Sequence, residues 1–159
     1  MKNDKREKEA IDPAKRLGEV LQFMRLLWAV DHGLQSRSKR MEADLGITGP
    51  QRLVIRVVGR FPGISAGDLA DILHIHPSTL TGVLQRLQKR GMIERKRDPK
   101  DARRAQLWVT ARGEEIDAVR SGTVEAAVRR ALHRVPETQL DHARTLLASI
   151  ADALLDEKD

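Results

Sequence analysis

Two histidines one residue apart, His74 and His76, come closest to a metal-binding motif in this 159-residue chain. That spacing can supply two metal ligands from a strand or loop, but no cysteine and no nearby third ligand accompanies it. Because Pro77 follows directly, we expect His76 to cap the start of a helix and His74 to lie at the end of the preceding one. A nucleophile paired with a base and a glycine-rich phosphate loop are also missing. The sequence therefore predicts no metal, no cofactor and no enzymatic activity.

Positive charge is the second concentration of chemistry, and it lies between Gln85 and Arg104. This segment holds nine basic and three acidic residues, a surplus that equals the net charge of +6 for the whole chain. The rest of the chain is balanced, with 20 basic and 20 acidic residues. A positive field focused in this way is typical of proteins that bind polyanions, of which nucleic acid is the commonest.

The composition indicates one helical domain with a modest core. With 40% hydrophobic and 33% charged residues, we expect the chain to complete its core by pairing with a second copy as a homodimer. The absence of cysteine excludes disulfides and thiol-based redox sensing. No signal peptide or apolar run of membrane-spanning length is evident, which predicts a cytoplasmic protein with no membrane partner.

Helices must position the charged residues, and apolar periodicity predicts where they lie. Residues 1–13 are polar and predict a flexible lead-in, whereas residues 14–45 predict one long amphipathic helix. A short helix follows from Gln51 to Arg60. Its arginines share one face at four-residue spacing, and its apolar residues are expected to point inward. The arginines are Arg52, Arg56 and Arg60, and the inward set is Leu53, Val54, Val57 and Val58.

Two further short helices with a tight join predict a helix-turn-helix. Ser65 and Asp68 have the spacing of a capping box, and the helix they start runs to about His74. The second helix extends from Ser78 to Arg90 and stops at Gly91. Its buried stripe consists of Leu80, Val83, Leu84 and Leu87.

A β-hairpin is predicted next, from Met92–Arg97 and Ala105–Thr110 on either side of a polar turn. Thr110 is then expected to cap one long helix to about His133, and Pro136 to open the last helix. The expected fold is mainly α with a small β-hairpin wing. In it, residues 49–110 form a winged helix-turn-helix lobe, flanked by dimerisation helices in residues 14–45 and 111–159.

Several separate signatures fall in this order at matching distances, and together they resemble the multiple-antibiotic-resistance regulator (MarR) family. They are Pro77-Ser78-Thr79-Leu80-Thr81, the run Arg86 to Arg95, the turn Asp98 to Arg104, and Thr110-Ala111-Arg112-Gly113. The resemblance implies a homodimeric transcriptional regulator, usually a repressor that small anionic or phenolic ligands release from DNA. Where many relatives have arginine after the Thr-Leu/Val-Thr run, this chain has Gly82.

The exposed face of the second helix is expected to read base edges in the major groove of double-stranded DNA. Gln85 can pair with adenine and Arg86 with guanine, each contributing roughly 1 to 3 kcal/mol of discrimination. A dimer of such lobes requires a pseudo-palindromic operator with half-sites about 10 bp apart. The expected contact residues are Ser78, Thr79, Thr81, Gln85, Arg86 and Lys89.

In the wing, the resemblance implies that Arg103 enters the minor groove and that Asp101 braces the turn by pairing with a nearby arginine. Arg104 is either a backbone contact or that partner. We expect Arg95, Lys96 and Arg97 to contact phosphates, with an affinity that falls steeply with salt.

An effector site is a further hypothesis, because ligand pockets of the family lie between the first helix and the DNA-binding lobe. Trp28, His32, Arg52 and Arg56 could hold an aromatic or anionic ligand by stacking and charge-assisted hydrogen bonds. The alternative is that Trp28 is interface core and His32 its polar neighbour. Two other functions stay open: a winged-helix module for protein–protein interaction, and a constitutive DNA-binding protein without a ligand switch.

Overall fold

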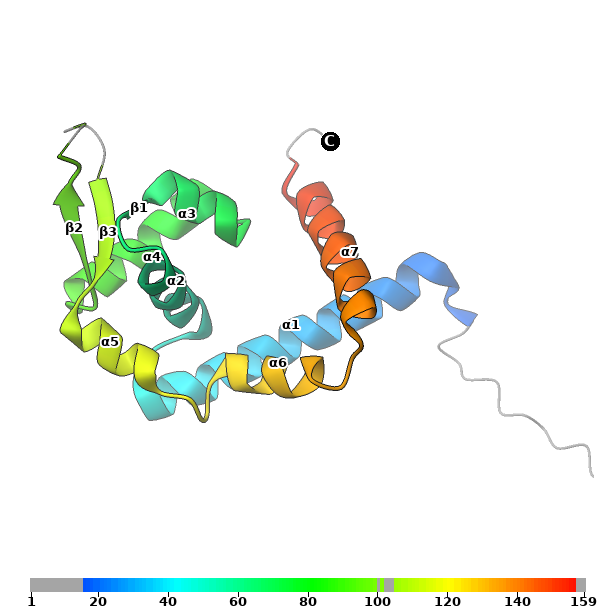
Figure 1. Ribbon diagram of the computed structural model, residues 1–159. Helices are drawn as coiled ribbons and strands as arrows, with labels where there is room; N and C mark the ends of the chain where they lie inside the picture. The colour runs from blue at the N-terminus through cyan, green and yellow to red at the C-terminus, as the bar shows by residue number, and fades with distance from the viewer. Residues whose placement is uncertain (1–15, 100, 102–104, 157–159) are drawn as a thin grey trace, which may run out of the picture. The chain divides into compact units, whose positions relative to one another are not determined.

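The computed structural model describes residues 16–99, 101 and 105–156, and it divides the chain into two units, residues 1–36 and 37–159. The predicted class is confirmed, because the described chain is mostly helical with one small antiparallel sheet (Figure 1). The expected lead-in, residues 1–13, lies outside the described residues. The helices are α1 (Gly18–Leu45), α2 (Gly49–Arg60), α3 (Ala66–Leu73), α4 (Pro77–Lys89), α5 (Ala111–Ala118), α6 (Val124–Leu132) and α7 (Glu137–Leu155), and the strands are β1 (Ile64–Ser65), β2 (Ile93–Arg97) and β3 (Ala105–Val109).

Side-chain caps explain why most of these helices begin where they do. Ser65, Thr110 and Thr123 each accept a hydrogen bond from the backbone N–H three residues ahead, which satisfies a donor that has no partner within the helix. His76 does the same for Ser78 through Nδ1. The predicted caps at Ser65, His76 and Thr110 are therefore confirmed. Thr48 forms a full capping box with Gln51, which starts α2.

The core of the lobe lies where α2, α3 and α4 pack against each other and the sheet. The predicted stripe of α4 is confirmed, since Leu80, Val83, Leu84 and Leu87 are all buried. Side chains from the other elements join it, including Ile55, Leu69 and Leu107. Burying each aliphatic side chain of this kind stabilises a fold by about 1.5 to 3 kcal/mol. This core holds α4 rigidly with its opposite face in solvent.

The sheet has one strand more than the predicted hairpin. Strands β2 and β3 pair antiparallel, with Ile93 opposite Val109 and Arg97 opposite Ala105. The two-residue strand β1 adds to the other edge of β3, with Ile64 opposite Leu107. A strand of two residues leaves no alternating pattern to detect, and it is recognisable only through its partner.

The prediction of one helix from Thr110 to about His133 was wrong. Helix α5 ends at Ala118, and α6 begins at Val124. Between them Gly122 adopts a positive φ of 70°, which interrupts a right-handed helix, and Thr123 caps the new one. The break is held by contacts from α2, described below.

The predicted inward face of α2 was also partly wrong. Val54 and Val58 are buried as expected, but Leu53 is exposed and Val57 is only half-buried. The charged Arg52 is buried in their place, 1% exposed. The helix is therefore rotated about its axis relative to the orientation that its apolar residues alone predicted.

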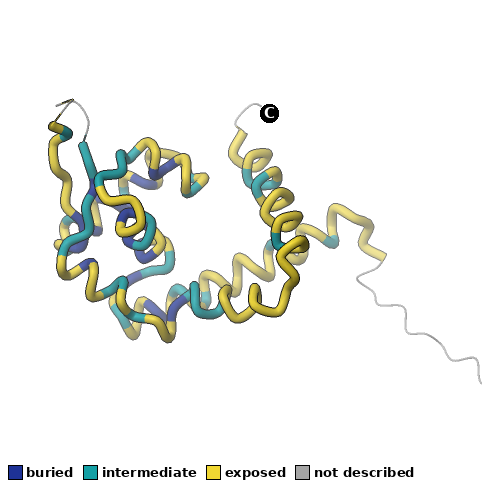
Figure 2. The backbone as a smooth tube through the Cα atoms, in the orientation of Figure 1, coloured by how far each residue is buried: buried dark blue, intermediate teal, exposed yellow. Residues whose placement is uncertain are grey.

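The remaining helices have apolar faces that the single chain does not cover. In the first unit, the part of α1 up to Ser36 has no buried residue, and Val20, Leu21 and Trp28 are exposed. In the second unit, α6 and α7 have no buried residue, as the burial colours along the backbone show (Figure 2). Val128, Leu146 and Leu147 are exposed. Among the described helices, none combines the length and apolar character needed to cross a membrane.

Candidate nucleic-acid interface

Helix α4 presents a polar face opposite its buried stripe. All six residues expected on this face are exposed. Proline at the first position and the His76 cap fix the start of the helix. The face consists of Ser78, Thr79, Thr81, Gln85, Arg86 and Lys89.

Local hydrogen bonds divide these residues into two groups. The hydroxyl of Ser78 lies 2.7 Å from His76 Nδ1, and the Thr81 hydroxyl donates to the carbonyl of Pro77 at 2.8 Å. Within the described residues, Gln85 and Arg86 make no side-chain hydrogen bond or ion pair. Their donors and acceptors are available to a ligand.

Gly82 lies one turn before Arg86 on the same helix. A Cβ at position 82 would lie 3.9 Å from a guanidinium nitrogen of Arg86. The Arg86 guanidinium thus extends back along the helix over Gly82, towards the part of the face where a longer side chain at position 82 would lie. Although position 82 itself has no arginine side chain, the guanidinium of Arg86 lies close to it.

The basic residues of β2 lie on opposite faces of the strand. Arg95 and Arg97 pair with Leu107 and Ala105 across the hairpin, and both are exposed. Lys96 is held within the wing, since its Nζ lies 2.7 Å from Glu94 Oε1 and 5.1 Å from the centroid of the Trp108 ring. The Trp108 contact is one that the sequence reasoning missed, because it depends on cross-strand register.

The outer end of the wing is only partly described. Asp101 is exposed, whereas Arg103 and Arg104 lie outside the described residues. The roles expected for these three residues therefore stay predictions.

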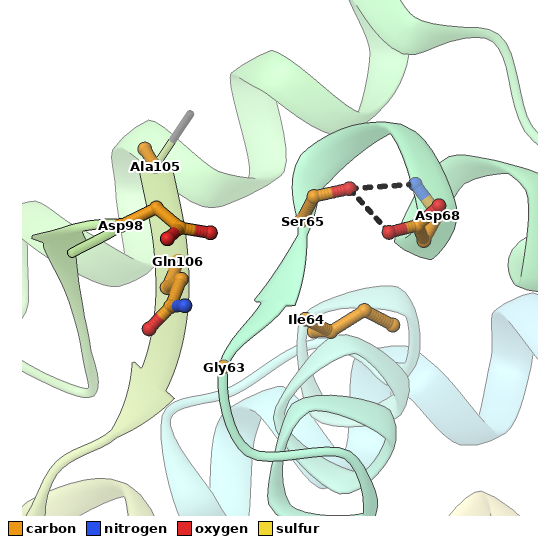
Figure 3. A pocket seen from close by; sticks show the side chains of 7 residues that line it. All are labelled: Gly63, Ile64, Ser65, Asp68, Asp98, Ala105 and Gln106. Carbon is orange, nitrogen blue, oxygen red and sulfur yellow. Dashed lines mark hydrogen bonds between the residues drawn. The ribbon is translucent and has the colours of Figure 1, made fainter. Parts of the chain in front are cut away.

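A small open cavity lies between the wing and the start of α3 (Figure 3). Two carboxylates line it, Asp68 and Asp98, together with Ser65 and Gln106. Ser65 Oγ lies 2.6 Å from Asp68 Oδ2 and accepts from the Asp68 N–H at 3.1 Å, so these side chains serve the cap of α3. The negative lining is poorly suited to a phosphate.

Two arginines of α2 form hydrogen bonds and ion pairs with residues on both sides of the break between α5 and α6. Arg52 Nε donates to Glu125 Oε1 at 2.8 Å. The remaining guanidinium nitrogens donate to the carbonyls of Ile116, Asp117 and Val119, the last at 2.6 Å. These carbonyls lie in the last turn of α5 and at the residue that follows it, where the regular hydrogen bonds of the helix end. Arg52 is thus a buried cation whose charge and hydrogen bonds are satisfied.

Arg56 reinforces this contact one turn further along α2. Its NH1 donates to Asp117 Oδ1 at 2.8 Å, and its Nε lies 3.5 Å from Glu125 Oε1. Burial raises the pKa of the Glu125 carboxyl, but a backbone hydrogen bond and the two guanidinium groups outweigh burial and hold that pKa below its ordinary value. Sequence reasoning missed Glu125 and Asp117, which lie more than 60 positions from their partners in the chain.

The residues expected to form an effector site fall into two groups. Trp28 and His32 are exposed, one turn apart on α1 in the first unit. Arg52 and Arg56 belong to the second unit and are engaged as described above. The other candidate ligands, His74 and His76, are caps of α3 and α4. The described residues contain no group of three His, Asp or Glu side chains that could hold a metal ion.

Comparison with known proteins gives a family match over part of the chain. A model described as "MarR family" matches residues 45–104. Transcriptional regulator HosA from Escherichia coli O111:H- is 36% identical over 83 residues, which cover 52% of this chain and 62% of HosA. The chain thus spans less than two thirds of the length of this curated relative.

Solved structures extend the likeness beyond that segment. A crystal structure of MarR is 28% identical, with a TM-score of 0.60, and the match covers 83% of this chain and 90% of that one. The complex of S. aureus MepR with DNA is 17% identical, with a TM-score of 0.68 over 83% of this chain and 97% of MepR, a likeness of fold. Together with the helix-turn-helix and the paired wing strands, these matches show that residues 45–104 are similar to the MarR family and that the described fold is that of winged-helix proteins.

Proposed function

We propose that this chain is a sequence-specific regulator of transcription that binds double-stranded DNA as a homodimer. The exposed face of α4 carries the proposal. The buried apolar stripe of α4 leaves Gln85 and Arg86 exposed on the opposite face, which is the face that a helix in the major groove would turn towards base edges. HosA is named a transcriptional regulator, and MepR was solved bound to DNA, which supports the same role here.

The proposed roles follow from the chemistry of each group. Gln85 and Arg86 read base edges, while Lys89, Arg95 and Arg97 neutralise phosphates. Arg103 is assigned to the minor groove. On an operator that overlaps a promoter, the bound dimer excludes polymerase sterically, so we expect repression at such a site.

Dimerisation is supported by the uncovered apolar faces. Exposed leucines and valines of α6 and α7 would gain burial in contact with a second copy of the chain. Two copies related by a twofold axis would present two α4 helices, which a pseudo-palindromic operator matches.

Selection from random double-stranded DNA tests the function directly. We expect a pseudo-palindrome with half-sites about 10 bp apart. Wild type, Arg86→Ala and the control Arg60→Ala are then titrated against single-base variants of the winning site. Arg60 is exposed on α2, and its replacement by alanine removes the same charge as Arg86→Ala. Loss of preference at one position per half-site in Arg86→Ala alone is the expected result. Failure to enrich any sequence would contradict the proposal and favour a protein-interaction module.

We further propose that a small aromatic or anionic effector lowers the affinity for DNA, with Trp28 and His32 as its contacts. The exposed indole and imidazole offer stacking and a hydrogen bond. Calorimetry with salicylate, followed by a DNA-release assay, tests this. An absence of both heat and release would count against the effector and favour a constitutive DNA-binding protein.

A further inference from the structure

Arg52 is the one charged side chain that is buried among the described residues. Its position in the fold is unusual, because it touches three consecutive parts of the chain. It donates to Ile116 and Asp117 at the end of α5, to Val119 in the following joint, and to Glu125 in the first turn of α6.

Helix α5 belongs to the lobe, and α6 leads away from it. The first turn of α5 is tied to the lobe, because the N–H of Thr110 donates to the carbonyl of Met92 at 3.1 Å and the Thr110 hydroxyl to the carbonyl of Gly91 at 2.6 Å. α6 has no buried residue and belongs to the helices proposed to form the dimer. The joint of residues 119–123 contains Gly122 at a φ of 70° and the buried Thr123, and Val124 at the start of α6 packs against the edge of the apolar core. Beyond this one apolar contact, the described contacts that tie α6 to the lobe include the polar ones that Arg52 and Arg56 make with Glu125.

We propose that Arg52, Arg56 and Glu125 are positioning residues for DNA recognition, which set the distance and angle between the two lobes of the dimer. This inference rests on the proposed function. Each α4 must enter the groove one helical turn of DNA away from the other, and each base pair inserted between half-sites moves them apart by about 3.4 Å and rotates them by about 35°. A joint that is held in one conformation makes the protein selective for one spacing. A loosened joint lets the lobes adapt to others.

The experiment measures affinity as a function of half-site spacing. Wild type, Glu125→Gln and Arg56→Met are titrated against the selected operator and against versions with one or two central base pairs inserted or removed. Arg60→Met is the matched control, because it removes the same charge from the same helix as Arg56→Met. Arg60 itself makes no ion pair within the described residues. Arg52→Met is included where thermal melting shows that it folds.

For wild type and Arg60→Met, we expect each altered spacing to weaken binding at least about tenfold, the effect of losing roughly one good base contact. In Glu125→Gln and Arg56→Met, this ratio should fall to about threefold or less, while binding to a single half-site stays unchanged. A spacing preference as sharp as that of wild type would overturn the proposal, as would an equal loss of affinity at every spacing. If wild type itself selects no operator, the proposed function has failed, and this result is distinct from either of those.

Discussion

Gly113 lies at the closest approach between α5 and the segment that joins α4 to the wing. A Cβ at this position would lie 2.2 Å from the carbonyl oxygen of Met92 and 2.6 Å from Cγ1 of Val109. The same carbonyl accepts a hydrogen bond from the N–H of Thr110 at 3.1 Å. Because the obstacle is backbone, a rotamer change cannot relieve the contact. In Gly113→Ala, the first turn of α5 must move away from Met92.

The size of this effect follows from the geometry. An ordinary contact between carbon and oxygen is about 3.3 Å or more, so the helix must retreat by about 1 Å. Overpacking of this kind costs about 1 to 3 kcal/mol. Weakening the Thr110 hydrogen bond adds about 1 kcal/mol. We therefore expect a loss of about 2 to 4 kcal/mol, a large share of the 5 to 15 kcal/mol typical of a whole protein.

Urea denaturation at a fixed protein concentration measures this loss, because the stability of the proposed dimer would depend on concentration. With a slope near 2 kcal/mol per molar, the midpoint should fall by about 1 to 2 M. Gly67→Ala is the control. Its Cβ would meet nothing nearer than Ser65 Oγ at 3.8 Å, so alanine in the first turn of α3 should stabilise by about 0.5 to 1 kcal/mol. If the free energy of unfolding of Gly113→Ala lies within about 0.5 kcal/mol of the wild-type value, the close packing of α5 on Met92 is refuted.

Three other outcomes are expected. Replacing Arg97 by alanine should weaken binding to all DNA sequences alike and reduce the salt slope of log K by about one, as measured in a salt titration; a sequence-dependent loss would contradict its phosphate role. Glu125→Gln should cost stability at pH 7, and because the pKa of Glu125 is lowered on folding, the difference from wild type should shrink as the pH falls from its ordinary value of 4.5 through the folded value. Urea denaturation at pH 7 and at pH 3 checks the sign, and an equal difference at both would be inconsistent with it. Leu147→Asp, on the exposed apolar face of α7, should raise the dissociation constant of the dimer in sedimentation equilibrium, whereas unchanged association would exclude Leu147 from the interface.

Local chemistry made much of the lobe predictable. The stripe of α4 follows from apolar residues at helical spacing, and the caps at Ser65 and Thr110 follow from a hydroxyl that reaches a backbone N–H three residues ahead. The hairpin of β2 and β3 was visible in the alternation around its turn. The Thr48 and Gln51 capping box had an equally local signal, Thr-x-x-Gln, which was overlooked.

The errors share one cause, which is a contact between residues far apart in the chain. Helical spacing predicted that Leu53 would point inward and that Arg52 would share a different face with Arg56 and Arg60. Instead Leu53 is exposed and Arg52 is buried, because Arg52 meets Glu125, 73 residues away, and carbonyls at and just beyond the end of α5. The same contacts hold the break near Gly122 that divides the expected long helix into two.

Apolar spacing, cap residues and the charge block thus determined the helix order of the lobe, the wing hairpin and the face of α4 on which Gln85 and Arg86 lie, because each shows in a pattern of residues close together in the chain. Tertiary packing decided how the lobe meets its flanking helices. A buried guanidinium is stable only where acceptors such as carbonyls and a carboxylate surround it. Residues of α2, the end of α5 and α6 bring those groups together around Arg52, and no local sequence pattern predicts that meeting.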